Sequence, residues 1–374
     1  MTAVAHDTFE GLEIHLPVPI LPVKWHHGWV CDIGLQRTLE AVEKARHDMC
    51  SLVFIWATLD TTQKLHAIEV MERYAIELVV VCKDAHFDTT NSRRSRPLEF
   101  EWCFPGEPDP LSKLTSASMR STLPAFEYAC VSSCICIAHG EAGMFYSTST
   151  HTYALAIVQF ELCMQRCRLT VETLLQTVTN SAQWARLRRQ GLPLQLLPSW
   201  LNLLASRVNH KAQIHSIQQV ATQDESNERN TTLVYLTRGA EDSACRIVVS
   251  ARALLLDQKF LLQTQVDIAT AYYLSAVEEA HRVRVQCLLQ DAEYALFSEN
   301  SGFVCILLHD CLVSAKLAFM REVDDHQMVA VSKAVEELKQ LSILSSSVPT
   351  SSDDECVQKW RAQLQRRRYS EIQP

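Results

Sequence analysis

Residues 153–175 read YALAIVQFELCMQRCRLTVETLL, and this stretch decides the fold class. Its apolar side chains recur every three or four residues, the spacing that places them on one face of an α-helix. The pattern predicts one long amphipathic helix from about Ser149 to about Val178. The residues of its apolar face are Tyr153, Ile157, Phe160, Met164, Cys167, Val171 and Leu174.

The scarcity of glycine and proline extends this interpretation to the rest of the chain. Of 374 residues, 9 are glycine and 12 are proline, whereas average usage is about 7% and about 5%. Sandwiches, propellers and doubly wound sheets need more glycine for their turns. We therefore predict an all-α protein, a helical solenoid of about eight long helices with short connections.

The expected organisation has three parts: a flexible N-terminus at 1–16, a helical domain at 17–343, and a disordered hinge with a basic tail at 344–374. The helical domain begins with an extended lead-in, because its three prolines, Pro17, Pro19 and Pro22, forbid a helix. Asp32 is expected to cap the first helix, and Thr61 or Thr62 the second. Further helices are expected at about 124–140, 149–178, 199–223, 231–256, 259–297, 303–321 and 326–343.

Charge and hydropathy limit the classes of partner. The net charge of −8 offers no general attraction to nucleic acid. No apolar run approaches the roughly 18 residues of a membrane span, and no signal segment opens the sequence, so we expect a cytoplasmic protein. A basic tail could contact an acidic membrane surface, direct nuclear import or remain a solvated end. Its residues are Lys359, Arg361, Arg366, Arg367 and Arg368.

Cysteine is abundant, with 14 residues, and raises the question of metal binding or catalysis. Cys163 and Cys167 are four apart, which places two thiols on one helical face. However, no Cys-x-x-Cys pair accompanies them, and the chain lacks a Gly-x-Ser-x-Gly string and a phosphate-binding loop. We expect reduced thiols that pack as small hydrophobes, with no catalytic residue, metal or cofactor. A cysteine- or zinc-dependent enzyme is the less favoured alternative.

Four apolar residues flank the connection between two expected helices. Ile214 and Ile217 precede it, and Leu233 and Leu236 follow it. A groove lined by such residues accepts the apolar face of an amphipathic helix. Ordinary core packing explains the same pattern equally well, and the sequence leaves both interpretations open.

Several strings in order resemble the BRO domain family, which includes Alix, BROX, the rhophilins and fungal Rim20-type proteins. The resemblance covers about residues 17–340. After the proline-rich lead-in, Phe100-Glu101-Trp102 stands where the family has a Phe-x-Trp string. The helix start from Leu123 to Val131 and the long helix from Ala154 to Leu175 follow, and the string from Ala269 to Ala276 resembles a late alanine- and tyrosine-rich helix. Ser133 and Cys134 replace a Phe-Asn pair of the family.

The resemblance implies an elongated, curved scaffold with tetratricopeptide-like helix pairs and no enzymatic activity of its own. Family members bind the C-terminal amphipathic helix of an ESCRT-III subunit of the charged multivesicular body protein type, which implies an adaptor that visits endosomal membranes. The family's charged groove rim corresponds to Thr150 and Ala154, which cannot supply those charges. The alternative is a structural subunit of a larger assembly. The apolar anchors of the family correspond to Ile214, Thr232, Leu233 and Leu236.

Overall fold

The structure is a computed structural model, and its two compact units are each described by themselves. Unit 1 and unit 2 share two long helices, α7 (Asn227–Leu256) and α8 (Gln263–Phe297), because each helix contributes residues to both. Unit 1 comprises Met1–Gln219 and Val249–Tyr273, and unit 2 comprises Val220–Val248 and Leu274–Pro374. The residues that the structure describes are 16–19, 33–83, 99–105, 116–122, 124–180, 192–222, 227–257, 263–297, 301–318, 332–333 and 335–337.

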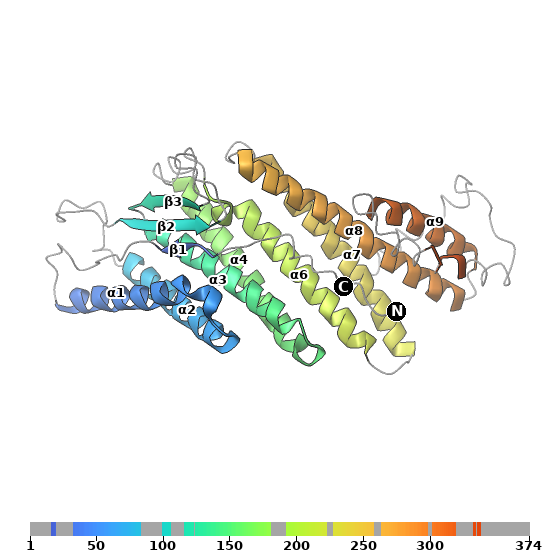
Figure 1. Ribbon diagram of the computed structural model, residues 1–374, viewed down its shortest axis with the longest axis horizontal. Helices are drawn as coiled ribbons and strands as arrows, with labels where there is room; N and C mark the ends of the chain where they lie inside the picture. The colour runs from blue at the N-terminus through green and yellow to red at the C-terminus, as the bar shows by residue number, and fades with distance from the viewer. Residues whose placement is uncertain are drawn as a thin grey trace. The chain divides into compact units, whose positions relative to one another are not determined.

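Four helices of unit 1 pack in chain order, each against the next (Figure 1). They are α1 (Ile33–Phe54), α2 (Thr61–Lys83), α3 (Pro124–Tyr146) and α4 (Tyr153–Asn180). The central one is α3, whose residues from Phe126 to Gly140 are buried except for the half-buried Tyr128. Its sequence there is rich in alanine, serine and cysteine, and these short side chains let neighbouring helices approach closely. The helices expected in this part of the chain and their succession as packed pairs are confirmed, and the fold class is all-α. The helix expected at 326–343 lies largely outside the described residues.

The contact between α3 and α4 includes two glycines of α3, Gly140 and Gly143. A Cβ atom placed on Gly143 would lie 2.4 Å from the ring of Phe160, so no larger residue fits without displacing that ring. Gly140, one turn earlier, would bring its Cβ to 3.8 Å from the Cys163 sulfur, an ordinary contact. Glycine therefore sets the spacing of the two helices at Gly143.

A small antiparallel sheet, in the order β1-β2-β3, lies against α3 (Figure 1). Its strands are β1 (Val18–Pro19), β2 (Phe100–Pro105) and β3 (Ser116–Ser121). The described part of the lead-in, residues 16–19, is therefore extended, as predicted, and it pairs Val18 with Cys103. In β2, Phe100, Trp102 and Phe104 alternate along one face and are fully buried.

A buried carboxylate joins the sheet to three helices. Glu127 of α3 accepts hydrogen bonds from Arg46 Nε at 2.7 Å and Tyr74 Oη at 2.9 Å, both to Oε1, and from Trp102 Nε1 at 2.5 Å to Oε2. Burial opposes the charge of Arg46, but attraction to Glu127 outweighs it and raises the pKa of Arg46 above its usual value. We call Arg46, Tyr74, Trp102 and Glu127 the Glu127 cluster. Two of the strings that carry the family resemblance thus meet in one contact.

Ser133 and Cys134, which replace the Phe-Asn pair of the family, both form hydrogen bonds in this packing. The Ser133 hydroxyl donates to the backbone oxygen of Gln195, in the 3-10 turn Leu194–Leu196 that precedes α6 (Pro198–Ala221). The Cys134 thiol donates to the backbone oxygen of Pro17 at 3.3 Å. Both short side chains therefore attach neighbouring segments to α3.

The helix boundaries correct the sequence interpretation at two positions. Asp60, rather than Thr61 or Thr62, caps α2: its Oδ1 accepts from the Gln63 backbone at 2.9 Å, while Gln63 Oε1 accepts from the Asp60 backbone at 3.0 Å. This reciprocal pair is a capping box. The polar run from Asp224 to Asn230, expected to be a connection, is already helical from Asn227, where acidic and amide side chains suit a helix N-terminus.

Unit 2 has a core of its own. Residues of α8 from Val285 to Ala292 pack against α9 (Ser301–Ala318) and against Val335. The Cys311 thiol of α9 also donates to the backbone oxygen of Val285 at 3.8 Å. Among the described residues, no helix combines the length and hydropathy needed to cross a bilayer. The expected domain boundary at 343 lies outside the described residues.

Candidate functional site

The first pair of predicted binding residues lies on α6 in unit 1. Ile214 and Ile217 are half-buried. Between them in sequence, His215 is buried, and its ring packs on Tyr153 at 4.8 Å and on Phe160 at 6.0 Å between centroids. These ring contacts attach α6 to α4, so the two isoleucines stand on a helix with a fixed orientation in its unit.

The second pair lies on α7 in unit 2. Leu233 and Leu236 are half-buried, and Thr232 is exposed. Both leucines stand four residues before buried residues of the same helix, Thr237 and Ala240. They therefore continue the packed face of α7 by one turn. Since they keep part of their surface in solvent, they offer apolar area to a partner.

Polar contacts next to this pair fix α7 against α8. The Thr237 hydroxyl lies 2.6 Å from the backbone oxygen of Leu233 and 2.5 Å from Gln290 Oε1. Arg238 Nη2 donates to Asp291 Oδ1 at 3.2 Å. The sequence prediction is thus located on two ordered helices, with one pair in each unit.

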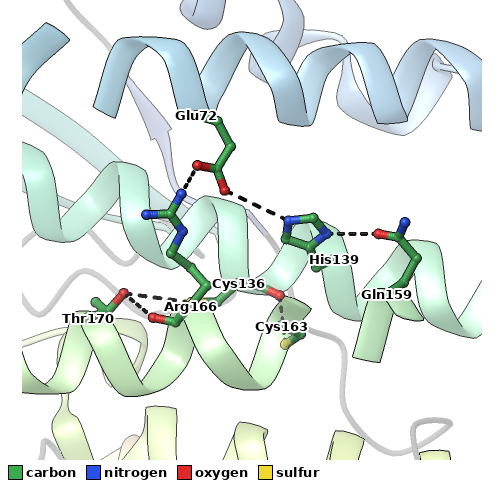
Figure 2. A network of polar contacts seen from close by, with 7 residues as sticks. All are labelled: Glu72, Cys136, His139, Gln159, Cys163, Arg166 and Thr170. Carbon is green, nitrogen blue, oxygen red and sulfur yellow. Dashed lines mark hydrogen bonds and ion pairs between the residues drawn. The ribbon is translucent and has the colours of Figure 1, made fainter. Parts of the chain in front are cut away.

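A polar network connects α2, α3 and α4 near the surface of unit 1 (Figure 2). Glu72 of α2 pairs with Arg166 of α4. On its other side, Glu72 faces His139 of α3: the Nε2 atom of His139 is 3.9 Å from Glu72 Oε1, and its Nδ1 is 2.8 Å from Gln159 Oε1 (Figure 2). Burial lowers the pKa of His139, although the bond with Gln159 opposes this. We call Glu72, His139, Gln159 and Arg166 the Glu72 cluster.

Beside this cluster, α4 exposes an apolar stripe that the sequence analysis missed. Phe160, Cys167 and Leu174 are buried, as the helical pattern predicted. A second apolar series shares the helix but faces solvent, and its regular spacing was the signal that could have revealed it. We name its residues the α4 seam: Leu155, Val158, Leu162 and Leu169.

The charged rim that the resemblance implied has no counterpart at the start of α4. Thr150 opens a short 3-10 turn and Ala154 lies in the first turn of α4; both are exposed. Any partner that contacts this region meets a hydroxyl and a methyl group in place of two charges. Apolar contact and shape must therefore provide the affinity there.

Seven of the ten cysteines in the described ranges are buried, whereas Cys50 and Cys103 are half-buried and Cys245 is exposed. Burial and the proximity of Glu127 raise the pKa values of Cys130 and Cys134 well above the usual range. Hydrogen bonds with Cys136 and Cys163, together with burial, do the same for Cys167. A thiolate nucleophile requires the opposite shift. Within the described ranges, no group of three metal-ligating side chains comes together. The basic tail residues 359–368 lie outside these ranges.

Comparison with known proteins identifies the fold. No protein-family profile matches the chain, and no curated protein matches its sequence. A solved complex of ALIX BRO1 with CHMP4C matches with a TM-score of 0.66 and 13% identity, over 91% of both chains. A structure described as the basis for endosomal targeting by the Bro1 domain matches with a TM-score of 0.61 and 12% identity, over 90% of this chain and 87% of that one.

A third match covers part of a longer protein. The crystal structure of ALIX in complex with the SIVmac239 late domain matches with a TM-score of 0.66 and 13% identity, over 91% of this chain and 46% of that chain. Together these matches show that the chain has the fold of the BRO domain. The fold expected from the resemblance is confirmed, and at these identities the comparison concerns the fold alone.

Proposed function

We propose that this chain, which has the BRO domain fold, is a non-catalytic adaptor of the ESCRT pathway. It binds the C-terminal amphipathic helix of an ESCRT-III subunit of the charged multivesicular body protein type. In this role it acts in the cytoplasm and at endosomal membranes. The fold supports the proposal, because one protein of the same fold is known in complex with CHMP4C.

The observation that carries the proposal is the partial exposure of Leu233 and Leu236 on α7. Two leucines three residues apart on one helical face present the apolar strip that an amphipathic helix requires. Fully burying a leucine side chain contributes about 1.5–3 kcal/mol. Two or three such anchors support a micromolar complex once the costs of association are subtracted.

The α6 residues Ile214 and Ile217 form a second candidate pair of anchors. They share the features of the α7 pair: aliphatic side chains three residues apart, half-buried on an ordered helix. Each pair can be disrupted separately, so the contribution of each to binding is measurable. The uncharged Thr150 and Ala154 predict that binding depends little on ionic strength, because few charges would be screened.

The decisive experiment measures the affinity of the purified chain for an ESCRT-III C-terminal peptide, for which CHMP4C is a suitable source. We expect Leu236→Asp to weaken binding by at least about tenfold, because it places a charge in an apolar contact. Ile214→Asp tests the α6 pair in the same assay. Unfolding curves verify that both variants remain folded.

The matched control is Tyr235→Asp. Tyr235 neighbours Leu236 but is 68% exposed on another face of α7, so its replacement should leave the affinity unchanged. Wild-type affinity in the Leu236→Asp and Ile214→Asp variants together would refute the assigned anchors. A wild-type chain that binds no ESCRT-III helix would refute the proposed function itself.

A further inference from the structure

The α4 seam is a regular series of four apolar side chains exposed to solvent along one helix. Leu155, Val158, Leu162 and Leu169 are 51%, 48%, 38% and 46% exposed. They span 15 residues of helix, and the first and last are about 21 Å apart along its axis. Exposed apolar residues scattered singly are common in soluble proteins, but several of them aligned on one face of a helix indicate a contact surface.

The spacing of the seam indicates what covers it. Leu155, Leu162 and Leu169 are seven residues apart, and Val158 lies three residues after the first. These are the a and d positions of a heptad, which align with the axis of a second helix packed at a small angle. The remaining d positions, Gln165 and Glu172, are also exposed. The complementary surface is therefore another helix.

The charges beside the seam match a second copy of the same helix. Glu161 and Arg168 are exposed and occupy successive g positions. In an antiparallel helix pair, g positions face g positions of the other helix. Glu161 of one copy then meets Arg168 of the other, and the symmetry of the pair forms this contact twice. We propose that two copies of this chain associate through their α4 seams in antiparallel orientation.

A parallel arrangement lacks this complementarity. It would bring Glu161 toward Arg166 of the second copy, since g then faces the next e position. Arg166 already pairs with Glu72 of its own chain, and its side chain is only 14% exposed. Among the described residues, neither Glu161 nor Arg168 forms an ion pair within the chain. The two exposed charges are therefore available only to the antiparallel pair.

The antiparallel register follows from the same positions. Val158 of one copy packs against Leu169 of the other, and Leu162 packs against Gln165. A polar residue within a seam of this kind fixes the register at a cost in stability. Leu155 lies at each end against the aliphatic part of Glu172. Since only two apolar layers are complete, the dimer is weak and depends on protein concentration.

Sedimentation equilibrium of the full chain tests the dimer, over about 5 to about 500 μM. We expect the wild type to change from monomer to dimer within this range. Leu162→Asp should weaken association by at least about tenfold, because it places two like charges in the seam. Glu161→Arg and Arg168→Glu should each weaken association, since each opposes like charges, and the double variant Glu161→Arg/Arg168→Glu should restore it.

The variants with exchanged charges distinguish association through the α4 seam from association through another surface. All three substituted positions are exposed, so circular dichroism should show unchanged helicity in the four variants. A wild-type chain that stays monomeric at the highest concentration would refute the dimer. Dimers that tolerate Leu162→Asp would refute the seam, and failure of the double variant to recover would refute the antiparallel register. A seam that instead binds the ESCRT-III peptide, with loss of affinity in Leu162→Asp, would also overturn the second copy as its occupant.

Discussion

Two polar clusters of unit 1 have the same kind of ion pair at their centre but differ in how far that pair is buried. Each centres on a glutamate that pairs with an arginine of another helix, and each attaches α3 to its neighbours. In the Glu127 cluster, the side chains of Arg46 and Glu127 are 2% and 0% exposed. In the Glu72 cluster, those of Arg166 and Glu72 are 14% and 32% exposed.

This difference in burial determines what each cluster contributes. A buried charge that loses its partner retains its full desolvation cost, so breaking a buried pair is strongly destabilising. A pair in contact with water is screened and its charges are easily rehydrated, so it contributes little. The Glu127 cluster therefore holds the sheet and helices together. The Glu72 cluster connects α2, α3 and α4 but contributes little to the free energy of unfolding.

The largest expected effect comes from removing the buried carboxylate. Glu127→Ala leaves Arg46 charged and buried, and leaves the polar hydrogens of Tyr74 and Trp102 without their acceptor. We expect the free energy of unfolding to fall by about 3–5 kcal/mol. Urea denaturation followed by circular dichroism measures this change.

Glu141→Ala provides the matched control on the same helix. Glu141 accepts from Trp56 Nε1 at 2.7 Å and lies 3.6 Å from Lys64 Nζ, but its side chain is 33% exposed. Its loss should cost about 1 kcal/mol, the usual contribution of one hydrogen bond. Equal losses in Glu127→Ala and Glu141→Ala would contradict the central role of burial.

An intermediate effect is expected from the exposed pair. A double-mutant cycle with Glu72→Gln and Arg166→Gln isolates their interaction from other effects of each substitution. We expect a coupling energy of about 0.5–1 kcal/mol, which decreases in high salt because the pair is partly solvated. A coupling as large as the loss in Glu127→Ala would remove the contrast between the two clusters.

Local patterns in the sequence identified most of the fold. The helical spacing of residues 153–175 located α4, and the prolines of the lead-in marked the extended segment that becomes β1. Such patterns succeed because each depends on residues close together in the chain. The pairing of β2 with β3 was not predicted, since it joins two segments that are not adjacent in sequence and depends on the packing of Trp102 against α3.

The candidate site was less accessible to sequence reasoning. Leu233 and Leu236 could be selected as apolar residues, but their partial exposure depends on where the packing of α7 against α8 ends. The α4 seam was overlooked because its leucines alternate with a buried apolar series on the same helix. A hydrophobic pattern shows that residues share a face, whereas exposure depends on which faces the rest of the chain covers.

The smallest expected effect is a change of stability with pH, which arises from His139 in the Glu72 cluster. Burial lowers the pKa of His139 in the folded chain below its ordinary value of about 6.5. The unfolded chain therefore binds a proton at His139 more readily than the folded chain does. Stability from this group is complete above about pH 6.5 and is lost as the pH falls through that value. Protonated His139 would face Glu72, which favours its charge, and Arg166, which opposes it.

The measurement compares urea midpoints at about pH 7.5 and about pH 5.5 for wild type and His139→Gln. The wild type should lose more stability at the lower pH than the variant does, because glutamine keeps a polar contact with Gln159 but cannot titrate. His66→Gln serves as the control, since the side chains of His66 and its neighbour Glu69 are 63% and 75% exposed. It should retain the full pH dependence of the wild type. If His139→Gln also retains the pH dependence of the wild type, the Glu72 cluster does not respond to pH. The two clusters then differ only in the burial of their ion pairs.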